Sequence, residues 1–520
     1  ATFMEPNRDF GVSLILSPED DLLDLTLATD GNGGIEFARY HHRIGGARAP
    51  RFAMDIVTHE ADWRGGLRWM SRRYPEYFNP VIGSVHEMGG TSAYSAAETD
   101  FDVALMKKMA FRTNWKASFD FPYMGMFLPP VEGETWQRYS GESGKGGPTS
   151  IAAMAEYSRR MRTLGFHVLN YFNVTEFGAD IVFPPPPHRA KSEADLWKDS
   201  NDFLYGALAD AILYVPASAR ADAWGKGRTG PNRPYYTWGA GIAMDCGEPS
   251  YRQFLLEQAR RHIYRLPESS GICIDRLDWL RMYNERRDDG VSWFVDKPAR
   301  SLVMSWKGFM KDLGPMMHNA GKVIFVNNHD KRLDLLHSID GIFDEFTSNG
   351  AALNTTALLC IRRPALGWTN REEEIKSDPD GFFQRFLYLG VWPMAPFPGN
   401  DHSLTPSAWV NRQYLDYGPM MDAMRGRQWV LEPHAAEVEG DAARANLFET
   451  PDGYIAPVML GGATSSVRLI LRGLHGTPRA AAALHPRNPE WMNVPFSRRG
   501  GSWVLDVPLK RGCAMVRVSR

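Results

Sequence analysis

A short segment of the chain, GICIDRLDWL at positions 271–280, runs from apolar residues directly into charged and aromatic ones. Ile272, Cys273 and Ile274 have the composition of a buried strand, and Asp275 follows at once. Successive side chains of a strand point to opposite faces, so if Ile272 and Ile274 face helices, Asp275 lies on the other face and can meet a ligand. The residues after it add a cation, a carboxylate and an indole: Arg276, Asp278 and Trp279.

A second carboxylate follows another apolar segment, DGIFDEF at 340–346. The same alternation places Glu345 on the inner face if Ile342 faces a helix, with Asp344 as the alternative candidate. Two carboxylates that face each other can cleave a glycosidic bond: one attacks or stabilises C1 and the other protonates the leaving oxygen. A separation of ~5–5.5 Å gives retention, and ~6.5–9.5 Å gives inversion. The structural alternatives for such residues are a helix N-cap or a surface ion pair.

The elements that must position these groups alternate regularly from about residue 81 onward. Strand-like segments, the first expected at 84–90 (SVHEMGG), are each followed by a segment with helical spacing, such as 150–165 and 250–266. Eight repeats of strand and helix predict an α/β fold, a (β/α)8 barrel of the TIM type. In such barrels the active site lies at the C-terminal ends of the strands, where Asp275 and Glu345 would meet.

Different patterns flank this region. Residues 1–80 predict a short N-terminal β region, followed by a linking helix over 61–78. The barrel is expected over 81–425. Beyond it, short strands separated by turns predict a C-terminal β-sandwich over 426–520.

Polar and aromatic residues follow the other predicted strands and would surround the same opening. Aromatic faces with hydrogen-bonding neighbours suit sugar rings, whose faces are apolar and whose edges carry hydroxyls. We expect three indoles to stack on sugars: Trp115, Trp279 and Trp368. Hydroxyl-binding groups are expected among Lys116, Arg276, Asp278, Asn327 and His329, and further rim residues are Asp120, Tyr171, Asn173, Glu176 and Arg332. The basic side chains leave an acidic or sulfated sugar as one option.

Bulk composition argues against several other classes. Lys and Arg total 59 against 61 Asp and Glu, a formal charge of -2, which gives no reason to expect a nucleic-acid or membrane partner. No apolar run approaches the ~18–20 residues of a transmembrane helix. The four cysteines lack metal-binding spacing, and no glycine-rich nucleotide motif follows a strand, so no metal and no cofactor are implied. The first ten residues lack the features of a signal peptide, which leaves the compartment open, and the oligomeric state is also open.

With this pattern the chain resembles the retaining α-glycosidases built on a (β/α)8 barrel, broadly the α-galactosidase and endo-α-N-acetylgalactosaminidase group. The resemblance rests on GICIDRLDW, which matches the nucleophile strand of that group, and on DGIFDEF, which matches its acid/base strand. It implies that Asp275 attacks C1 and that Glu345, or Asp344, acts as acid and base. The Trp-rich K-x-D strand of the α-galactosidases is missing, so galactose specificity is not implied.

We therefore expect a glycoside hydrolase that cleaves an α-glycosidic bond in an oligo- or polysaccharide with retention. One alternative is an inverting glycosidase or a transglycosylase on the same scaffold. A second is a non-catalytic carbohydrate-binding protein. A third is a barrel aldolase or lyase, for which Lys116 is the plausible Schiff-base lysine.

Overall fold

A computed structural model of the chain describes most of its residues. The described ranges are 1–30, 32–45, 49–94, 102–116, 127–128, 135–137, 148–216, 232–345, 350–368, 372–394, 407–440 and 442–520. Side chains are not described at a few further positions within these ranges.

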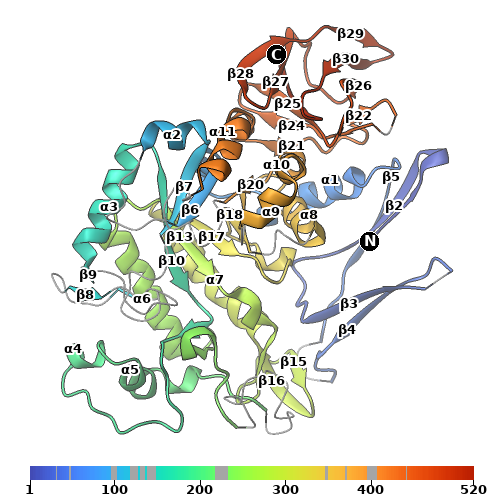
Figure 1. Ribbon diagram of the computed structural model, residues 1–520. Helices are drawn as coiled ribbons and strands as arrows, with labels where there is room; N and C mark the ends of the chain where they lie inside the picture. The colour runs from blue at the N-terminus through green and yellow to red at the C-terminus, as the bar shows by residue number, and fades with distance from the viewer. Residues whose placement is uncertain are drawn as a thin grey trace.

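Eight parallel strands form the central sheet, in the order β20-β19-β18-β17-β13-β10-β7-β6. An isolated parallel bridge between Ser92 and Met394 links the two ends of this order, so the sheet closes into a barrel. The predicted (β/α)8 fold is thereby confirmed (Figure 1). The strands are β6 (Thr91–Tyr94), β7 (Phe111–Lys116), β10 (His167–Asn173), β13 (Gly271–Asp275), β17 (Val323–Asn327), β18 (Gly341–Asp344), β19 (Ala365–Gly367) and β20 (Trp392–Pro393).

Helices follow the strands and cover the outside of the barrel (Figure 1). Local sequence sets where several of them begin: the Ser150 hydroxyl accepts from the Ala153 amide at the start of α3, and Pro249 occupies the first turn of α6. None of the helices in the described ranges is long and apolar enough to span a bilayer. The helices are α2 (Val103–Lys108), α3 (Ile151–Thr163), α6 (Pro249–Arg265), α7 (Leu302–Asn319), α8 (Gly350–Leu359), α9 (Glu372–Ser377), α10 (Pro379–Leu389) and α11 (Ala408–Ala423).

The first barrel strand lies later than the sequence predicts. Residues Gly83–Met88 form a 3₁₀ helix, and β6 begins only at Thr91. The apolar residues Val85 and Met88 are buried from this helix, so their spacing of three reflects a helical turn rather than a strand. The prediction of a strand over 84–90 is therefore wrong: most of this segment is a 3₁₀ helix, and the first barrel strand follows it.

Residues before the barrel form two small antiparallel units. A three-stranded sheet has the order β1 (Thr2–Glu5), β2 (Phe10–Leu16), β5 (Met54–His59), and β3 (Asp24–Thr29) pairs with β4 (Ile35–Tyr40) as a separate hairpin. Helix α1 (Arg64–Arg73), the predicted linking helix, packs against β2 and β5. Gly66 permits this approach, because a Cβ there would meet the Ser13 hydroxyl at 2.1 Å.

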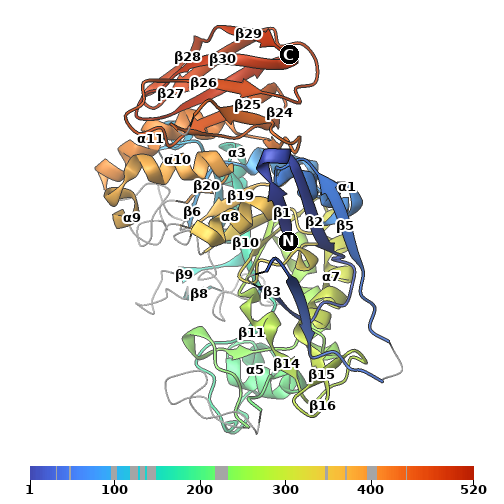
Figure 2. The same ribbon diagram turned by 90° about the vertical axis from the view of Figure 1, so that its right-hand side faces the viewer.

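The C-terminal part is a β-sandwich of two antiparallel sheets, as predicted. One sheet has the order β21-β24-β25-β31-β27-β28 and the other β22-β26-β30-β29. In β26 (Ser466–Leu471), Val467, Leu469 and Leu471 alternate with more exposed residues and join the apolar core between the sheets. Figure 2 shows the sandwich stacked on the side of the barrel that carries α10 and α11. The boundaries near residues 80 and 425 stay a prediction.

The described structure also contains the paired strands β8 (Trp136–Gln137) and β9 (Pro148–Thr149) and several short 3₁₀ helices. The remaining strands of the sandwich and the short elements between β10 and α7 are β11 (Glu176–Phe177), α4 (Glu193–Leu196), α5 (Ser200–Ala207), β12 (Ile242–Ala243), β14 (Tyr283–Asn284), β15 (Ser292–Phe294), β16 (Lys297–Ser301), β21 (Gln428–Trp429), β22 (Ala436–Val438), β23 (Arg444–Ala445), β24 (Phe448–Thr450), β25 (Gly453–Met459), β27 (Ala480–His485), β28 (Asn488–Asn493), β29 (Phe496–Arg499), β30 (Ser502–Pro508) and β31 (Ala514–Ser519).

One buried carboxylate ties the chain entering the barrel to the barrel itself. Asp340, fully buried just before β18, accepts hydrogen bonds from the backbone amides of Val81, Ile82 and Ile324 at 2.8, 3.1 and 2.9 Å. His318 of α7 contacts its other oxygen at 2.9 Å. Asp340 thus joins three segments that are far apart in sequence.

We expect Asp340→Ala to lower the free energy of unfolding by about 3 kcal/mol, because it leaves several buried donors without an acceptor. Chemical denaturation of the variant and wild type measures this difference. Asp312→Ala is the control: it removes a half-exposed ion pair with Arg252 and should cost less than about 1 kcal/mol. Equal small losses in the two variants would contradict the assigned role of Asp340.

Candidate active site

Asp275 stands at the C-terminal end of β13 and is held by donors from both neighbouring strands. The Tyr171 hydroxyl of β10 donates to Oδ2 at 2.8 Å, and the Asn327 amide of β17 donates to Oδ1 at 2.7 Å. Strand β13 packs closely against β17, since a Cβ at Gly271 would lie 2.0 Å from the Val323 carbonyl oxygen. Each oxygen of the Asp275 carboxylate therefore has a fixed donor.

Glu345, the residue after β18, reaches the same donor. Asn327 Nδ2 donates to Glu345 Oε2 at 2.9 Å, and His329 Nε2 lies 3.1 Å from that same oxygen. The His329 ring is itself oriented by a contact of 3.1 Å between Nδ1 and the Asn327 carbonyl oxygen. We call Asp275, Glu345, Asn327, His329 and Tyr171 the strand-end cluster.

The shared donor limits how far apart the two carboxylates can be. One nitrogen, Asn327 Nδ2, is 2.7 Å from an oxygen of Asp275 and 2.9 Å from an oxygen of Glu345. The two oxygens cannot be farther apart than the sum of these lengths. This limit applies to the nearest pair of oxygens, and it is compatible with the ~5–5.5 Å separation of retaining pairs.

The pKa values of Asp275 and Glu345 shift in opposite directions. Burial and the negative charge of Glu345 raise the pKa of Asp275. Burial also acts to raise the pKa of Glu345, but the hydrogen bonds from His329 and Asn327 outweigh it and lower that pKa. The pKa of His329 is raised, because its burial is outweighed by Glu345, Asp275 and Asp278. The cluster thus titrates as a coupled group of two carboxylates and an imidazole.

Asp344, the alternative to Glu345, faces away from this cluster. Its carboxylate is fully buried, pairs with Lys331 Nζ at 2.7 Å and accepts from the Thr356 hydroxyl of α8 at 2.5 Å. The alternation along β18 therefore turns Glu345 inward and Asp344 toward a helix, which is the orientation that the sequence analysis favoured.

The loop after β10 adds a second layer of polar groups. Asn173 Nδ2 lies 3.4 Å from the Tyr171 hydroxyl and donates to Glu176 Oε2 at 3.1 Å. Trp279 Nε1 donates to the other oxygen of Glu176 at 2.7 Å. Glu176 is 1% exposed, although the sequence marks it only as one polar residue of a rim. Nothing in its spacing distinguishes it, because two of its partners, Trp279 and Arg276, come from the loop after β13.

Arg276 follows Asp275 in a left-handed backbone conformation, with φ 57° and ψ 50°. Its guanidinium pairs with Asp278 at 3.1 Å and lies 3.6 Å from Glu176 Oε1. Asp278 and Trp279 belong to the 3₁₀ helix Leu277–Arg281 that begins at this point. Arg276, Asp278 and Trp279 thus lie beside the cluster but bind one another or Glu176.

The other predicted site residues have different fates. Trp368 packs edge-on against Phe343, the inward residue of β18, with ring centroids 5.6 Å apart.

Arg332 is not brought to the cluster: it pairs with Asp334 and donates to the carbonyl oxygens of Leu22 and Leu23. Its role as a sugar-binding residue stays a prediction. Asp120 lies outside the described residues, as do the side chains of Trp115 and Lys116 on β7.

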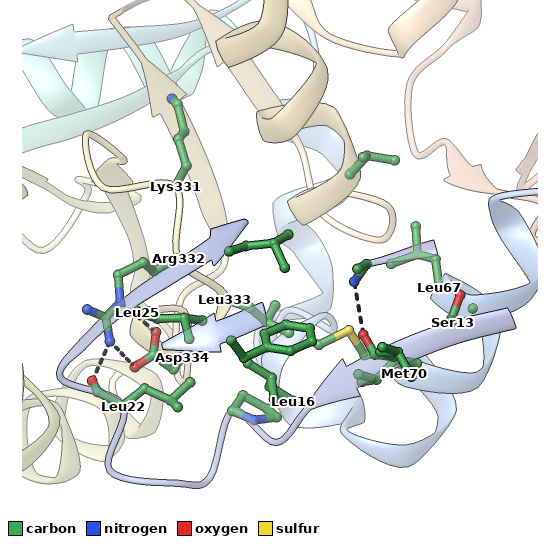
Figure 3. Close-up of a pocket in the computed structure, with 18 of the residues that line it drawn as sticks. Ser13, Leu16, Leu22, Leu25, Leu67, Met70, Lys331, Arg332, Leu333 and Asp334 are labelled. Carbon is green, nitrogen blue, oxygen red and sulfur yellow. Dashed lines mark hydrogen bonds and ion pairs between the residues drawn. The ribbon is translucent and has the colours of Figure 1, made fainter. Parts of the chain in front are cut away.

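A cavity of about 690 Å³ lies between the N-terminal β region and the barrel (Figure 3). Its walls are mainly apolar, with Leu16, Leu25, Leu67 and Met70 among them, and Arg332 lies at one end. No member of the strand-end cluster lines it. The cavity is thus separate from the polar site, and Arg332 belongs to the contact between the two parts of the chain.

The polar groups of the cluster suit a neutral organic ligand with hydroxyls. Within the described ranges, no group of three or more His, Cys, Asp or Glu side chains is arranged to hold a metal ion. The cluster contains the buried Asp275 carboxylate with two donors, the Glu345 carboxylate beside the His329 imidazole, and the Tyr171 side chain. Such an arrangement can supply a nucleophile and a proton donor to one bond.

Comparison with known proteins shows the fold. No family model and no curated protein matches the sequence. Among solved structures, a cycloisomaltooligosaccharide glucanotransferase from Paenibacillus sp., complexed with cycloisomaltoheptaose, is 8% identical, with a TM-score of 0.51, and the match covers 98% of this chain and 97% of that chain. An α-amylase from Geobacillus thermoleovorans, complexed with acarbose, is 10% identical, with a TM-score of 0.51 over 84% of this chain and 99% of that chain.

Asp275 and Asp344 should respond in opposite ways to loss of their charge. Because the pKa of Asp275 is raised in the folded protein, its ionisation weakens folding as the pH rises above the ordinary value of about 3.9. We expect Asp275→Asn to raise the melting temperature relative to wild type, and this gain to grow from acid to neutral pH. Asp344→Asn removes an ion pair with Lys331 and should lower the melting temperature at neutral pH.

Thermal denaturation of the wild type and both variants at several pH values provides the measurement. A gain for Asp275→Asn that is the same at every pH would show that carboxylate charge is not its source.

Proposed function

We propose that the chain is a glycoside hydrolase that cleaves an α-glycosidic bond in an oligo- or polysaccharide by a retaining, two-carboxylate mechanism. The observation that carries this proposal is the single donor, Asn327 Nδ2, shared by Asp275 and Glu345. It brings one oxygen of Asp275 and one oxygen of Glu345 close together, which supports a retaining pair over the inverting alternative. The fold shared with an α-amylase and a glucanotransferase is consistent with the proposal.

In the first step Asp275 attacks C1 of the sugar while Glu345 donates its proton to the glycosidic oxygen, and the bond between C1 and that oxygen breaks. A covalent ester between the sugar and Asp275 results. In the second step Glu345 takes a proton from water, whose oxygen bonds to C1 from the face that the leaving group occupied. The ester bond between C1 and Asp275 breaks, and Asp275 leaves as a carboxylate. The two displacements together retain the configuration at C1.

The productive state of the pair carries one proton, placed on Glu345. The hydrogen bond from His329 opposes this placement, because it lowers the pKa of Glu345. A glycosidic oxygen that takes the position of the His329 ring nitrogen beside Glu345 Oε2 removes that hydrogen bond. Substrate binding itself would then raise the pKa of Glu345 and prepare it to act as an acid.

The acceptor in the second step decides between two activities. Water gives hydrolysis, whereas a sugar hydroxyl at the same position gives transglycosylation through the same ester. One solved structure that matches nearly the whole chain is a glucanotransferase, so acceptor sugars belong in the assay. The resemblance of the two strand motifs to the α-galactosidase and endo-α-N-acetylgalactosaminidase group makes α-galactosides and α-N-acetylgalactosaminides the other substrates to include.

The direct test incubates wild type, Asp275→Asn and Glu345→Gln with aryl α- and β-glycosides and with α-glucans, including cycloisomaltoheptaose. We expect wild type to act on α-linked substrates with retention, followed by NMR of the first-formed anomer. Asp275→Asn should reduce kcat by more than about 10³-fold, since the nucleophile is lost. Asp344→Asn serves as the matched control, because it removes the neighbouring carboxylate from the outer face.

An inverted product would overturn the retaining mechanism. Glycan binding without turnover, unchanged in Asp275→Asn, would favour the non-catalytic carbohydrate-binding protein. Turnover that is lost in the Asp344 variant and kept in the Glu345 variant would exchange the assignments of these two residues.

His329 should set the pH range of activity. Its charge lowers the pKa of both Asp275 and Glu345, so removing it raises both. Because the active pair carries one proton, we expect both limbs of the kcat/KM profile to move to higher pH in His329→Ala. The exposed His475→Ala is the control. A profile that narrows or moves to lower pH would contradict this role.

A further inference from the structure

Glu176 is a buried carboxylate that the proposed two-carboxylate chemistry does not use. It is the first residue of β11, shortly after β10, and it is 1% exposed. Burial raises its pKa to about 7, with the Arg276 charge and the Trp279 hydrogen bond acting in the opposite direction. Burying a carboxylate is unfavourable, and this one lies beside the nucleophile strand rather than on the surface. Its position therefore indicates a role in the site.

One set of contacts leads from Glu176 to the nucleophile along β10. Glu176 Oε2 accepts from Asn173 Nδ2 at 3.1 Å, and that nitrogen lies 3.4 Å from the Tyr171 hydroxyl. The Tyr171 hydroxyl donates to Asp275 Oδ2 at 2.8 Å. The Asn173 side chain cannot easily turn, because its oxygen accepts from the amides of Thr175 and Glu176 at 3.1 Å each.

A second set of contacts holds the backbone that follows the nucleophile. Glu176 Oε1 accepts from the Trp279 indole at 2.7 Å and lies 3.6 Å from Arg276 Nη2. The neighbouring Thr175 hydroxyl donates to the Arg276 carbonyl oxygen at 2.5 Å. Arg276 has a positive φ, which costs on the order of 1 kcal/mol for a residue with a side chain and needs such support.

We propose that Glu176 is a positioning residue for the nucleophile: it fixes the Asn173–Tyr171 donors on one side of Asp275 and the Arg276–Trp279 turn on the other. The inference rests on the proposed function, in which Asp275 attacks C1. An attacking carboxylate must approach C1 in line with the leaving group, and a displacement of about 1 Å can reduce the rate by about 10²-fold.

The experiment separates the attack by Asp275 from the proton donation by Glu345. The substrate is the α-glycosyl fluoride on which wild type is most active. In its first step the bond from the Asp275 oxygen to C1 forms, the C1–F bond breaks, and fluoride leaves as an anion without a proton from Glu345. The value of kcat/KM on this substrate, which covers the first step only, therefore reports on the nucleophile.

We expect Glu176→Gln to lower kcat for the fluoride by about 10–100-fold with KM changed by less than about threefold. The glutamine can still accept from Trp279, so Glu176→Ala should lose more. Glu345→Gln should keep most of its first-step rate on the fluoride, which places Glu176 with Asp275 and not with Glu345. Adding Asn173→Ala to Glu176→Gln should cost much less than the two single losses combined, because both act through one chain of contacts.

Asp245→Asn is the matched control. Asp245 is a fully buried carboxylate just after β12, the strand that pairs with β11, but it binds Ser305, Asn284 and Arg300 and does not reach the strand-end cluster. The control shows how much kcat falls when an equally buried charge is lost nearby. Melting temperatures of both variants measure the accompanying loss of stability.

Three distinguishable results would contradict the positioning role of Glu176, the chain of contacts through Asn173, or the proposed function. A kcat of Glu176→Gln within about twofold of wild type, or a loss no larger than that of Asp245→Asn, would overturn the positioning role while leaving the proposed function intact. Full additivity with Asn173→Ala would overturn the contact chain. Wild type that turns over no α-glycosyl fluoride or α-glycoside, with Asp275→Asn behaving identically, would remove the proposed function first.

Discussion

The site depends on one side-chain amide, that of Asn327, placed between two carboxylates. Asp275 and Glu345 repel each other when both are charged, and burial strengthens the repulsion. A neutral donor that bonds to both at 2.7 and 2.9 Å holds them at a short distance without cancelling either charge. A cation at that position would instead neutralise the pair and leave neither group suited to attack or to proton transfer.

Closure of the barrel makes this arrangement possible. Strands β10, β13, β17 and β18 are consecutive neighbours in the sheet, and their C-terminal ends supply Tyr171, Asp275, Asn327 and Glu345 in that spatial order. The parallel registers place Asn173 beside Asp275 and Asn327 beside Phe343. Residues separated by up to 174 positions therefore lie at one edge of the barrel, because the strands themselves place them there.

Alternation along strands was the sequence signal that carried most information about the site. It distinguished Glu345 from Asp344 because β18 is a regular strand with one inward and one outward carboxylate at its end. It could not place Arg332 or Glu176. Arg332 lies in the loop after β17 and Glu176 in the short strand β11 outside the barrel, and there tertiary contacts, not a period of two, decide the direction of a side chain. The 3₁₀ helix Gly83–Met88 was missed for a related reason: six residues with two apolar positions are too few to establish a period.

The charges of the site bear on its ligand. Four carboxylates gather at the ends of β10, β13 and β18, namely those of Asp275, Glu345, Glu176 and Asp278, against the cations of Arg276 and His329. Two basic side chains that follow β17 are paired away from the cluster, Lys331 with Asp344 and Arg332 with Asp334, and the side chain of Lys116 lies outside the described residues.

In the productive state the proton on Glu345 and the cations of Arg276 and His329 offset most of this negative charge. The Asp275 carboxylate stabilises the positive charge that develops at C1 and the ring oxygen as a glycosidic bond breaks. For the proposed reaction, this local electrostatic field assists cleavage. Glu176 contributes to that field without touching the sugar, because its contacts with Trp279 and Asn173 hold it just behind the groups that do.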